Sequence, residues 1–333
     1  MLDFKTVEYN SKTNELTILD QTKLPEEEVY LTLKTAEDVR RAIRHMNIRG
    51  APLIGVAAAY GVVLAARIGD QESIKKACAL IKSARPTAVN LSWAIDRMEK
   101  RLAGSGDHFA ELLAEAKAIE TEDKEACAAI GRYGADLIND NAKIMVHCNA
   151  GALATSGIGT ALGVLYTASQ QGKKFSVFSC ETRPLLQGAR LTSWELTKNG
   201  IDTYTICDNM AANFMAGMKL VLVGADRIAS NGDVANKIGT KGLAIIASYY
   251  KIPLYVAAPS STFDLRIASG DQIPIEERAE EEIRTFNDRC VVAPAAKICN
   301  PAFDVTPSEL ISGIITEHGI ITCPYAENIA NLM

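Results

Sequence analysis

Hydrophobic and polar residues alternate along the first 34 positions of the chain and then repeat at helical spacing. The stretches FKTVEYN, NELTILDQ and EVYLTLK alternate residue by residue and are separated by turn-forming residues, which is typical of short strands. From Thr35 onward the apolar positions follow a helical period, and PLIGVAAAYGVVLAARI, entered through Pro52, is apolar on almost every side. Such a helix should be buried. We therefore predict that residues 1–125 form an N-terminal domain of a small β-sheet plus helices.

A different rhythm begins near residue 143, where short apolar segments alternate with helical ones. The apolar segments are KIMVHC, KFSVFSC, DTYTIC, KLVLVGA and PLYVAA, and a helix-like segment follows each of them. Buried parallel strands have this appearance because the helices that connect them cover both faces of the sheet. We therefore predict an α/β fold whose C-terminal domain, residues 126–333, is a Rossmann-like parallel sheet with helices on both faces.

Polar residues follow these strands at the points where the strands end. In an open parallel sheet the carboxyl ends of the strands form the ligand-binding edge, and acids, amides and a thiol gathered there indicate a small-molecule site. Asp208, before NMAANFMAG, is also typical of a helix N-cap. The polar series consists of Cys148, Asn149, Glu181, Thr182, Arg183, Asp208, Asn209, Asp226, Arg227, Ser260 and Ser261.

Arginines just before predicted helices suggest that the ligand carries a phosphate. Arg49 and Gly50 precede the helix that opens with PLIG, and Arg85 precedes another; a helix start and a guanidinium both suit an oxyanion, although an ordinary turn into the helix explains Arg49 and Gly50 equally well. A turn-rich loop, SNGDVANKIGTKG, adds Asn236 and Lys237. Neither this loop nor GIGTALG has the spacing of a nucleotide-binding motif, so we expect a smaller phosphate ester.

Composition narrows the class of protein further. With 333 residues, 48% of them hydrophobic and 23% charged, the chain can bury a large core, and a net charge of -5 argues against binding to nucleic acid. No apolar run is long enough for a membrane span and MLDFKTVEYN is charged where a signal peptide is apolar, so we expect a cytoplasmic protein. The eight cysteines show neither CxxC nor zinc-type spacing, which predicts reduced thiols and no metal site.

Nine segments, in order along nearly the whole chain, resemble the methylthioribose-1-phosphate isomerase family. The resemblance implies a two-domain fold, a homodimer, and an aldose-ketose isomerase of methionine salvage that acts on a small sugar phosphate. The segments are IRGAPLIGVAAAYG, RPTAVNLSWAIDRM, HCNAGALAT, GTALG, ETRPLLQGARLTSWEL, DNMAANFM, VGADRIASNGDVANKIGTKGLA, IPLYVAAPSSTFD and IPIEER.

The resemblance also assigns roles to individual residues. Cys148 of HCNAG and Asp226 of GADRI match the family's catalytic pair. The reaction that it implies requires neither a metal nor an organic cofactor. The residues that match the family's substrate contacts are Arg49, Gly50 and Ala51 of RGA, Arg85 of RPT, Gln187 of LLQGAR, and Asn236 and Lys237 of NK.

A mechanism follows from these residue types. Asp226 is expected to protonate the ring oxygen, which requires a pKa raised by burial, and Arg227 would oppose that rise if it faced the same way. Cys148 is expected to assist the transfer of hydrogen from C2 to C1, either as a proton carrier or by shaping the site for a hydride shift. Since neighbours in a strand point to opposite faces, His147 is more suited to a structural role than to acid-base chemistry.

Related isomerases and a non-catalytic relative are the alternatives. Isomerases of 5-deoxyribose 1-phosphate or ribose 1,5-bisphosphate would use the same pair and differ in the pocket for C5, which we expect GVAAAYG and NLSW to line with apolar side chains. Cys180 and Ile158 depart from the family pattern and are expected near this pocket. A regulatory subunit of a translation initiation exchange factor would need no thiol and carboxyl pair.

Overall fold

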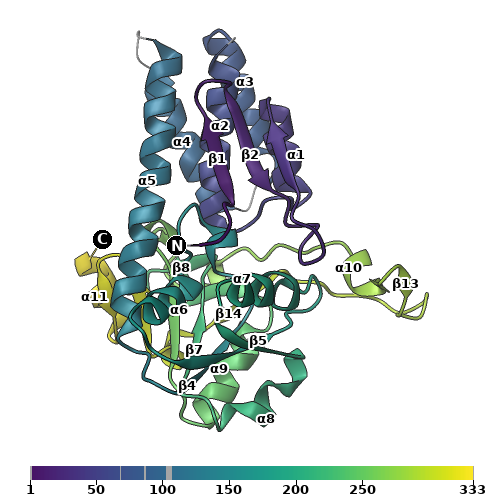
Figure 1. The fold of residues 1–333 in the computed structure, drawn as a ribbon, viewed down its shortest axis with the longest axis vertical. Coiled ribbons are helices and arrows are strands. Elements are labelled where there is room, and N and C mark those ends of the chain that lie inside the picture. Colours follow the sequence, from purple (N-terminus) through teal and green to yellow (C-terminus); the bar gives the residue numbers. More distant parts are fainter. Residues whose placement is uncertain (1, 68, 86–87, 103–106, 333) are drawn as a thin grey trace.

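The computed structural model describes residues 2–67, 69–85, 88–102 and 107–332. In its N-terminal part an antiparallel sheet of order β1-β2-β3 lies beside a group of helices, as the alternating and helical patterns predicted (Figure 1). The elements are β1 (Val7–Asn10), β2 (Glu15–Leu19), β3 (Tyr30–Leu33), α1 (Ala36–Arg44), α2 (Ala51–Ala66), α3 (Gln71–Lys82), α4 (Val89–Leu102) and α5 (His108–Ala135).

Helix α2 forms the centre of this part. Every residue from 53 to 64 is buried, because α1, α3, α4, α5 and β2 all pack around the helix. This arrangement explains the absence of a polar face in its sequence. The neighbouring α1 begins with a capping box, in which the Thr35 hydroxyl accepts the Asp38 N–H and the Asp38 carboxylate accepts the Thr35 N–H.

The C-terminal part is built on a seven-stranded sheet of order β16-β15-β10-β7-β4-β5-β6. All neighbours in it are parallel except β16, which runs antiparallel to β15. The five predicted parallel strands are confirmed; β15 and β16 were not predicted. The strands are β4 (Ala142–Val146), β5 (Phe175–Cys180), β6 (Asp202–Ile206), β7 (Leu220–Val223), β10 (Leu254–Ala257), β15 (Gly313–Thr316) and β16 (Gly319–Ile321).

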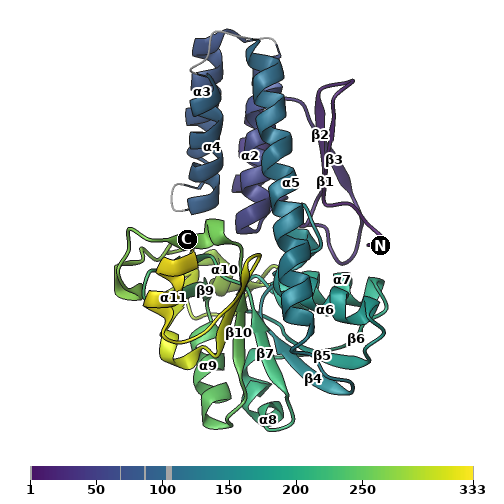
Figure 2. The ribbon, with the colours of Figure 1, turned by 90° about the vertical axis from the view of Figure 1, so that its left-hand side faces the viewer.

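Helices cover both faces of this sheet, which confirms the predicted fold class (Figure 2). Within β4, Ile144 and Val146 pack toward one face with α5, α6 and α7, whereas Met145 packs toward the other face with α8, α9 and α11. Alternation along the strand thus produces two separate cores. The covering helices are α6 (Ala161–Gln170), α7 (Ser193–Lys198), α8 (Ala211–Met215), α9 (Thr240–Tyr249) and α11 (Tyr325–Leu332).

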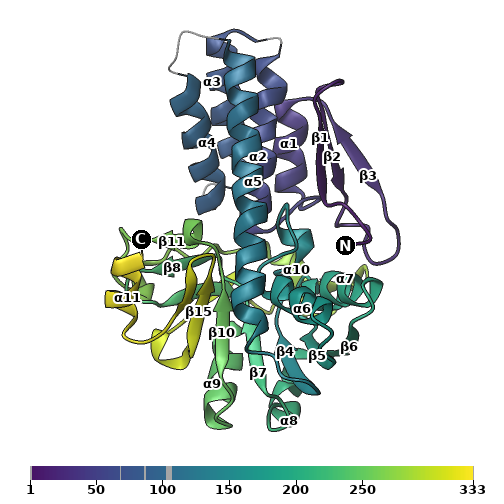
Figure 3. The same ribbon diagram turned by 60° about the vertical axis from the view of Figure 1, so that its left-hand side comes forward.

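A second, four-stranded sheet of order β11-β8-β9-β14 lies where the large sheet faces the N-terminal helices (Figure 3). The expectation of a loop around Asn236 and Lys237 is wrong, since both residues lie in β9, which pairs with β8 and β14. The strands are β8 (Arg227–Ala229), β9 (Val234–Lys237), β11 (Phe263–Asp264) and β14 (Phe303–Thr306).

Helix α5 connects the two parts of the molecule. Its first half contributes Leu112 and Ile119 to the core of the N-terminal helices, and its second half contributes Ile130 to the core beneath the large sheet. Position 125/126, where we predicted the boundary between two domains, falls inside this helix. The division into two domains stays a prediction.

Short elements complete the chain. Near the N-terminal part, α10 and the hairpin β12-β13 project from the body (Figure 1). Among the residues that the structure describes, no helix has the length and apolar character needed to cross a membrane. The short elements are η1 (Ala152–Ala154), the π-helix η2 (Gly188–Thr192), η3 (Asp208–Met210), η4 (Ser260–Thr262), η5 (Gly270–Gln272), α10 (Glu281–Arg284), β12 (Thr285–Phe286), β13 (Arg289–Cys290) and η6 (Ser308–Leu310).

Candidate active site

One cavity brings together all nine residues that match the family's catalytic pair and substrate contacts. It lies between the start of α2, the loop before α4, and the carboxyl ends of β4, β7 and β9. Its lining therefore combines the N-terminal helices with both C-terminal sheets. The nine residues are Arg49, Gly50, Ala51, Arg85, Cys148, Gln187, Asp226, Asn236 and Lys237.

Cys148 lies two residues beyond the end of β4 and has a left-handed backbone, with φ 60°. Its N–H donates to the Thr182 hydroxyl at 2.8 Å, and its carbonyl accepts from the Thr192 hydroxyl at 2.6 Å. Burial raises the pKa of the Cys148 thiol, and the positive charges of Lys237 and Arg49 only partly oppose that rise. The group in the cavity at neutral pH is therefore the thiol.

His147 lines the same cavity as Cys148, and its ring lies beside Cys180 and Asp208. The strand ends at Val146, and the left-handed backbone of Cys148 breaks the alternation. The His147 Nε2 atom lies 2.8 Å from the carbonyl oxygen of Ile238, which can only accept, so Nε2 carries the proton. Burial lowers the pKa of His147, which keeps the ring neutral.

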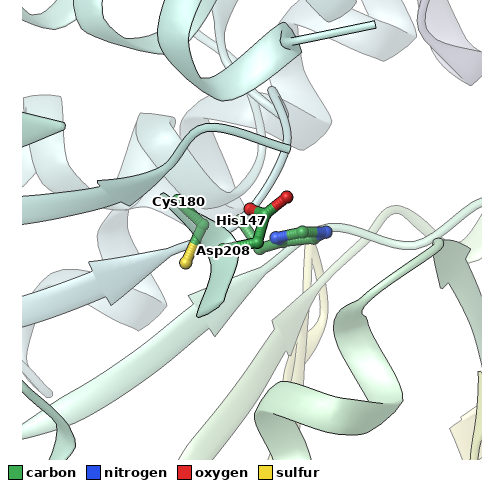
Figure 4. Close-up of side chains that lie close together, drawn as sticks. All are labelled: His147, Cys180 and Asp208. Atoms are coloured by element: carbon green, nitrogen blue, oxygen red, sulfur yellow. The ribbon is translucent and has the colours of Figure 1, made fainter. Parts of the chain in front are cut away.

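His147, Cys180 and Asp208 form a cluster whose possible ligand atoms lie within 4.8 Å of one another (Figure 4). The carboxylate of Asp208 accepts the N–H groups of Thr182 at 2.8 Å and Arg183 at 2.7 Å, and burial raises the pKa of the Cys180 thiol to about 12. Through these two hydrogen bonds the Asp208 carboxylate holds the loop that follows β5. The expected N-cap role of Asp208 is wrong, because α8 has no side-chain cap.

Asp226 follows β7 and is held by a hydrogen bond from its N–H to the Ala235 carbonyl at 2.9 Å. Burial raises the pKa of its carboxyl, although Lys237, Arg85 and Arg49 each work against the rise. Arg227 interacts instead with Asp264, at 3.7 Å from Nη1 to Oδ2. The carboxyl of Asp226 is thus suited to hold a proton and to donate it.

Cationic side chains surround the catalytic candidates. Arg49 donates through both Nη atoms to the Asn149 carbonyl, at 3.0 and 3.1 Å, and so joins the start of α2 to the end of β4. Arg85 and Arg278 bind opposite oxygens of Glu276, at 2.8 and 3.0 Å. Among the described residues five cationic side chains line the cavity, which favours an anionic ligand: Arg49, Arg85, Arg227, Lys237 and Arg278.

Two buried polar atoms of residues that line the cavity have no hydrogen-bond partner among the described residues. They are Gln187 Oε1 and Arg85 Nε. Buried polar atoms are almost always paired, so a bound ligand with hydroxyl and phosphate groups would satisfy both. Gln187 precedes η2 and stood out only through the family resemblance.

The apolar lining differs from the expectation. Among the described residues, neither 55–61 nor 90–93 lines the cavity, and neither do Cys180 and Ile158; the first helical stretch is enclosed inside the N-terminal core. The apolar side chains come from segments whose local pattern carries no sign of a site. They include Met46, Ile54, Val89, Leu185, Ile275 and Phe303.

The polar residues after the strands are only partly brought together. Cys148, Asn149, Asp226 and Arg227 line the cavity, whereas those after β5, β6 and β10 do not. Reasoning from the sequence missed Arg278, which lies in IPIEER. Its charge could have drawn attention, but only the structure shows that it lines the cavity, paired with Glu276 two residues before it.

Comparisons with known proteins agree with this architecture. Residues 47–323 match the initiation factor 2 subunit family. A methylthioribose-1-phosphate isomerase from Carboxydothermus hydrogenoformans is 54% identical, over 96% of this chain and 97% of its own length. One from Desulforudis audaxviator is 52% identical, over 95% of this chain and 94% of its own length.

Solved structures are similar over the same extent. The 5-methylthioribose 1-phosphate isomerase of Pyrococcus horikoshii has a TM-score of 0.91 at 40% identity, covering 98% of this chain and 95% of that one. A protein from A. fulgidus described as subunit delta of translation initiation factor eIF-2B has a TM-score of 0.89 at 40% identity, covering 99% of both chains. The chain belongs to the initiation factor 2 subunit family and, within it, to the methylthioribose-1-phosphate isomerases.

Proposed function

We propose that this chain converts 5-methylthioribose 1-phosphate to 5-methylthioribulose 1-phosphate, with Cys148 and Asp226 as its catalytic pair. The observation that carries the assignment of residues is the placement of a thiol and a carboxyl, both with raised pKa values, in one cavity among cationic side chains. Relatives at 54% and 52% identity that are named for this activity support the choice of substrate.

The cationic side chains bind the phosphate on C1. Arg85 and Arg278 share one carboxylate, Glu276, which orients both guanidinium groups so that their remaining N–H groups can donate to a phosphate dianion in the cavity. Lys237 Nζ, which is held at 3.0 Å by the Ala302 carbonyl, provides a further positive charge. The buried Gln187 Oε1 accepts a hydrogen bond from a sugar hydroxyl.

Asp226 opens the ring by donating its proton to the ring oxygen as the bond from that oxygen to C1 breaks. A hydride then moves from C2 to the cationic C1, and the C2 hydroxyl returns its proton to the Asp226 carboxylate and becomes the ketone. The raised pKa of the Cys148 thiol favours direct hydride movement beside a neutral thiol, because the proton-carrier route first requires a thiolate.

The same proposal covers assembly and location. We infer a homodimer in the cytoplasm, as the family resemblance implies.

The apolar side chains of Met46, Ile54 and Ile275 suit a methylthio group at C5 better than a second phosphate, which would need its own cationic pocket.

Proton NMR of the enzyme with 5-methylthioribose 1-phosphate in heavy water tests the reaction. We expect loss of the anomeric signal and appearance of the ribulose 1-phosphate, with no deuterium at C1 if hydride moves directly. Deuterium at C1 would establish the proton route instead. Turnover of ribose 1,5-bisphosphate or 5-deoxyribose 1-phosphate in place of this substrate, or of none of them, would contradict the proposed activity.

Two substitutions test the catalytic pair. We expect Asp226→Asn to lower kcat by about 10²–10⁴-fold, the range for loss of a general acid, and Cys148→Ser to abolish most activity while ligand binding survives. The exposed residues Asp202 and Cys323 provide matched controls, and Asp202→Asn and Cys323→Ser should retain full activity. Unchanged kcat in Asp226→Asn would remove that residue from the mechanism.

A further inference from the structure

The backbone of Cys148 adopts a conformation that its residue type does not favour. A φ of 60° places it in the left-handed region, where a Cβ atom is crowded by the main chain. Thr182 and Leu186, in the segment that passes beside it, have φ values of 63° and 56°. Such backbones persist where the surroundings over-determine them, and they gather at functional sites.

Two buried threonines hold the main chain of Cys148 from opposite sides. Thr182 Oγ1 accepts the Cys148 N–H at 2.8 Å, and Thr192 Oγ1 donates to the Cys148 carbonyl at 2.6 Å. Both threonines have 0% exposed surface, so water cannot replace either contact. Each polar group of the Cys148 backbone therefore depends on one hydroxyl.

The remaining bonds of these hydroxyls orient them for this purpose. The Thr182 hydroxyl donates to the Cys180 carbonyl at 3.0 Å, which leaves its lone pair for the Cys148 N–H. The Thr192 hydroxyl accepts from Asn149 Nδ2 at 3.1 Å, which leaves its hydrogen for the Cys148 carbonyl. Each hydroxyl thus donates once and accepts once.

The elements that carry the threonines are fixed in turn. The Asp208 carboxylate, drawn beside His147 and Cys180 in Figure 4, accepts the Thr182 N–H at 2.8 Å. Thr192 ends the π-helix η2, whose first residue, Gly188, approaches so closely that a Cβ there would lie 1.7 Å from the Cys180 carbonyl oxygen. Single π-turns are frequent at functional sites, and this one places the Thr192 hydroxyl.

We propose that Thr182 and Thr192 are positioning residues that hold Cys148 in its left-handed conformation and thereby keep its thiol in the cavity. The inference rests on the proposed function, since it takes Cys148 to be part of the reaction. With either hydroxyl removed, the backbone can relax toward an extended conformation, which would change the direction of the Cys148 side chain.

Valine and serine variants separate the hydroxyl from the rest of the side chain. We expect Thr182→Val and Thr192→Val to lower kcat about 10²-fold, the effect of misplacing a reacting group by about 1 Å, with KM within about threefold of wild type. Thr182→Ser and Thr192→Ser should restore most of kcat. Thr197, whose hydroxyl bonds only within α7, provides the control, and Thr197→Val should match wild type.

A second measurement does not depend on turnover. The rate at which iodoacetamide modifies Cys148, followed by mass spectrometry of its peptide across pH 6–10, should change in both valine variants and return in both serine variants. If the variants show this pattern of Cys148 modification but the wild-type protein lacks isomerase activity, the proposed function is refuted and the positioning role stays intact.

The positioning role is refuted if both valine variants keep wild-type kcat and wild-type modification of Cys148, or if the serine variants are as impaired as the valine variants. Where Thr182→Val does not fold, Thr192→Val decides the question, since it leaves the Cys148 N–H paired. Circular dichroism and thermal unfolding of each variant identify any loss that comes from folding alone.

Discussion

Glu195 lies behind the cavity with 0% of its surface exposed, and it is the most informative titratable residue outside the catalytic pair. Its carboxyl accepts from Asn149 Nδ2 and from the Leu153 N–H, both at 3.1 Å. Burial nonetheless raises its pKa to about 7. The carboxyl is therefore close to half protonated at neutral pH, directly behind the segment that carries Cys148.

This shift predicts a pH-dependent stability. Because the folded state raises the pKa of Glu195 from 4.5 to about 7, its contribution to the free energy of unfolding is complete below pH 4.5 and is lost as pH rises through 7. The loss amounts to about 3 kcal/mol. Glu195→Gln should flatten the change in urea midpoint between pH 5 and pH 8, whereas exposed Glu309→Gln should leave it as in wild type. Parallel profiles for wild type and Glu195→Gln would contradict the prediction.

At the scale of the elements, the entry into α2 depends on a residue without a side chain. Gly50 caps the helix with φ 96°, and a Cβ at this position would lie 2.5 Å from the Ala154 Cα atom in η1. The close approach brings α2 and the segment after β4 together at the cavity. An added methyl group would thus strain the backbone and separate two walls of the site.

Two glycine substitutions should change stability in opposite directions. Gly50→Ala should lower the free energy of unfolding by at least about 1–3 kcal/mol and weaken substrate binding, since its φ and its neighbours both resist a side chain. Gly242→Ala, in α9 with nothing within 4 Å of the added Cβ, should raise it by about 0.4–1 kcal/mol. Denaturant midpoints measure both. Equal stability of Gly50→Ala and wild type would show that the contact with Ala154 relaxes freely.

At the scale of the whole molecule, α5 is the element that both cores share. Leu112 and Ile119 belong to the core around α2, and Ile130 to the core beneath the large sheet. Because one continuous helix contributes to both, unfolding of either core removes support from the other. We infer that the wild-type chain unfolds in a single transition even if it contains two domains.

A proline in the middle of α5 should separate the two parts. Glu125 is exposed, and Glu125→Pro removes a helical hydrogen bond and costs about 3 kcal/mol. Once the other tryptophan is replaced by phenylalanine, Trp93 in α4 reports the N-terminal part, and Trp194 in α7 reports the C-terminal part together with its contact to Phe4. Their denaturant midpoints should coincide in wild type and in Glu125→Ala and diverge in Glu125→Pro. Coinciding midpoints in Glu125→Pro would show that contacts outside α5 couple the two parts.

Many of the strands and helices could be predicted from the local pattern of apolar and polar residues. The strands from β1 to β7 and helices such as α2 follow from periodicity, because an element must bury the face that its apolar residues form. Strand β9 was missed because VANK is short and flanked by turn residues. It pairs with β14, in which Asp304 lies opposite Asn236. A strand that depends on so distant a partner leaves no local signal.

The sequence alone thus determined the fold class, the strands from β1 to β7 together with β10, and the residue types at the carboxyl ends of those strands, since these depend on local burial and spacing. Only the tertiary structure decided which of these residues meet. It brought Arg85 to Glu276, left Asp208 to support a loop, and held Cys148 at the cavity between Thr182 and Thr192. The reason is that each of these positions depends on hydrogen bonds and ion pairs between segments far apart in the chain, which no local pattern records.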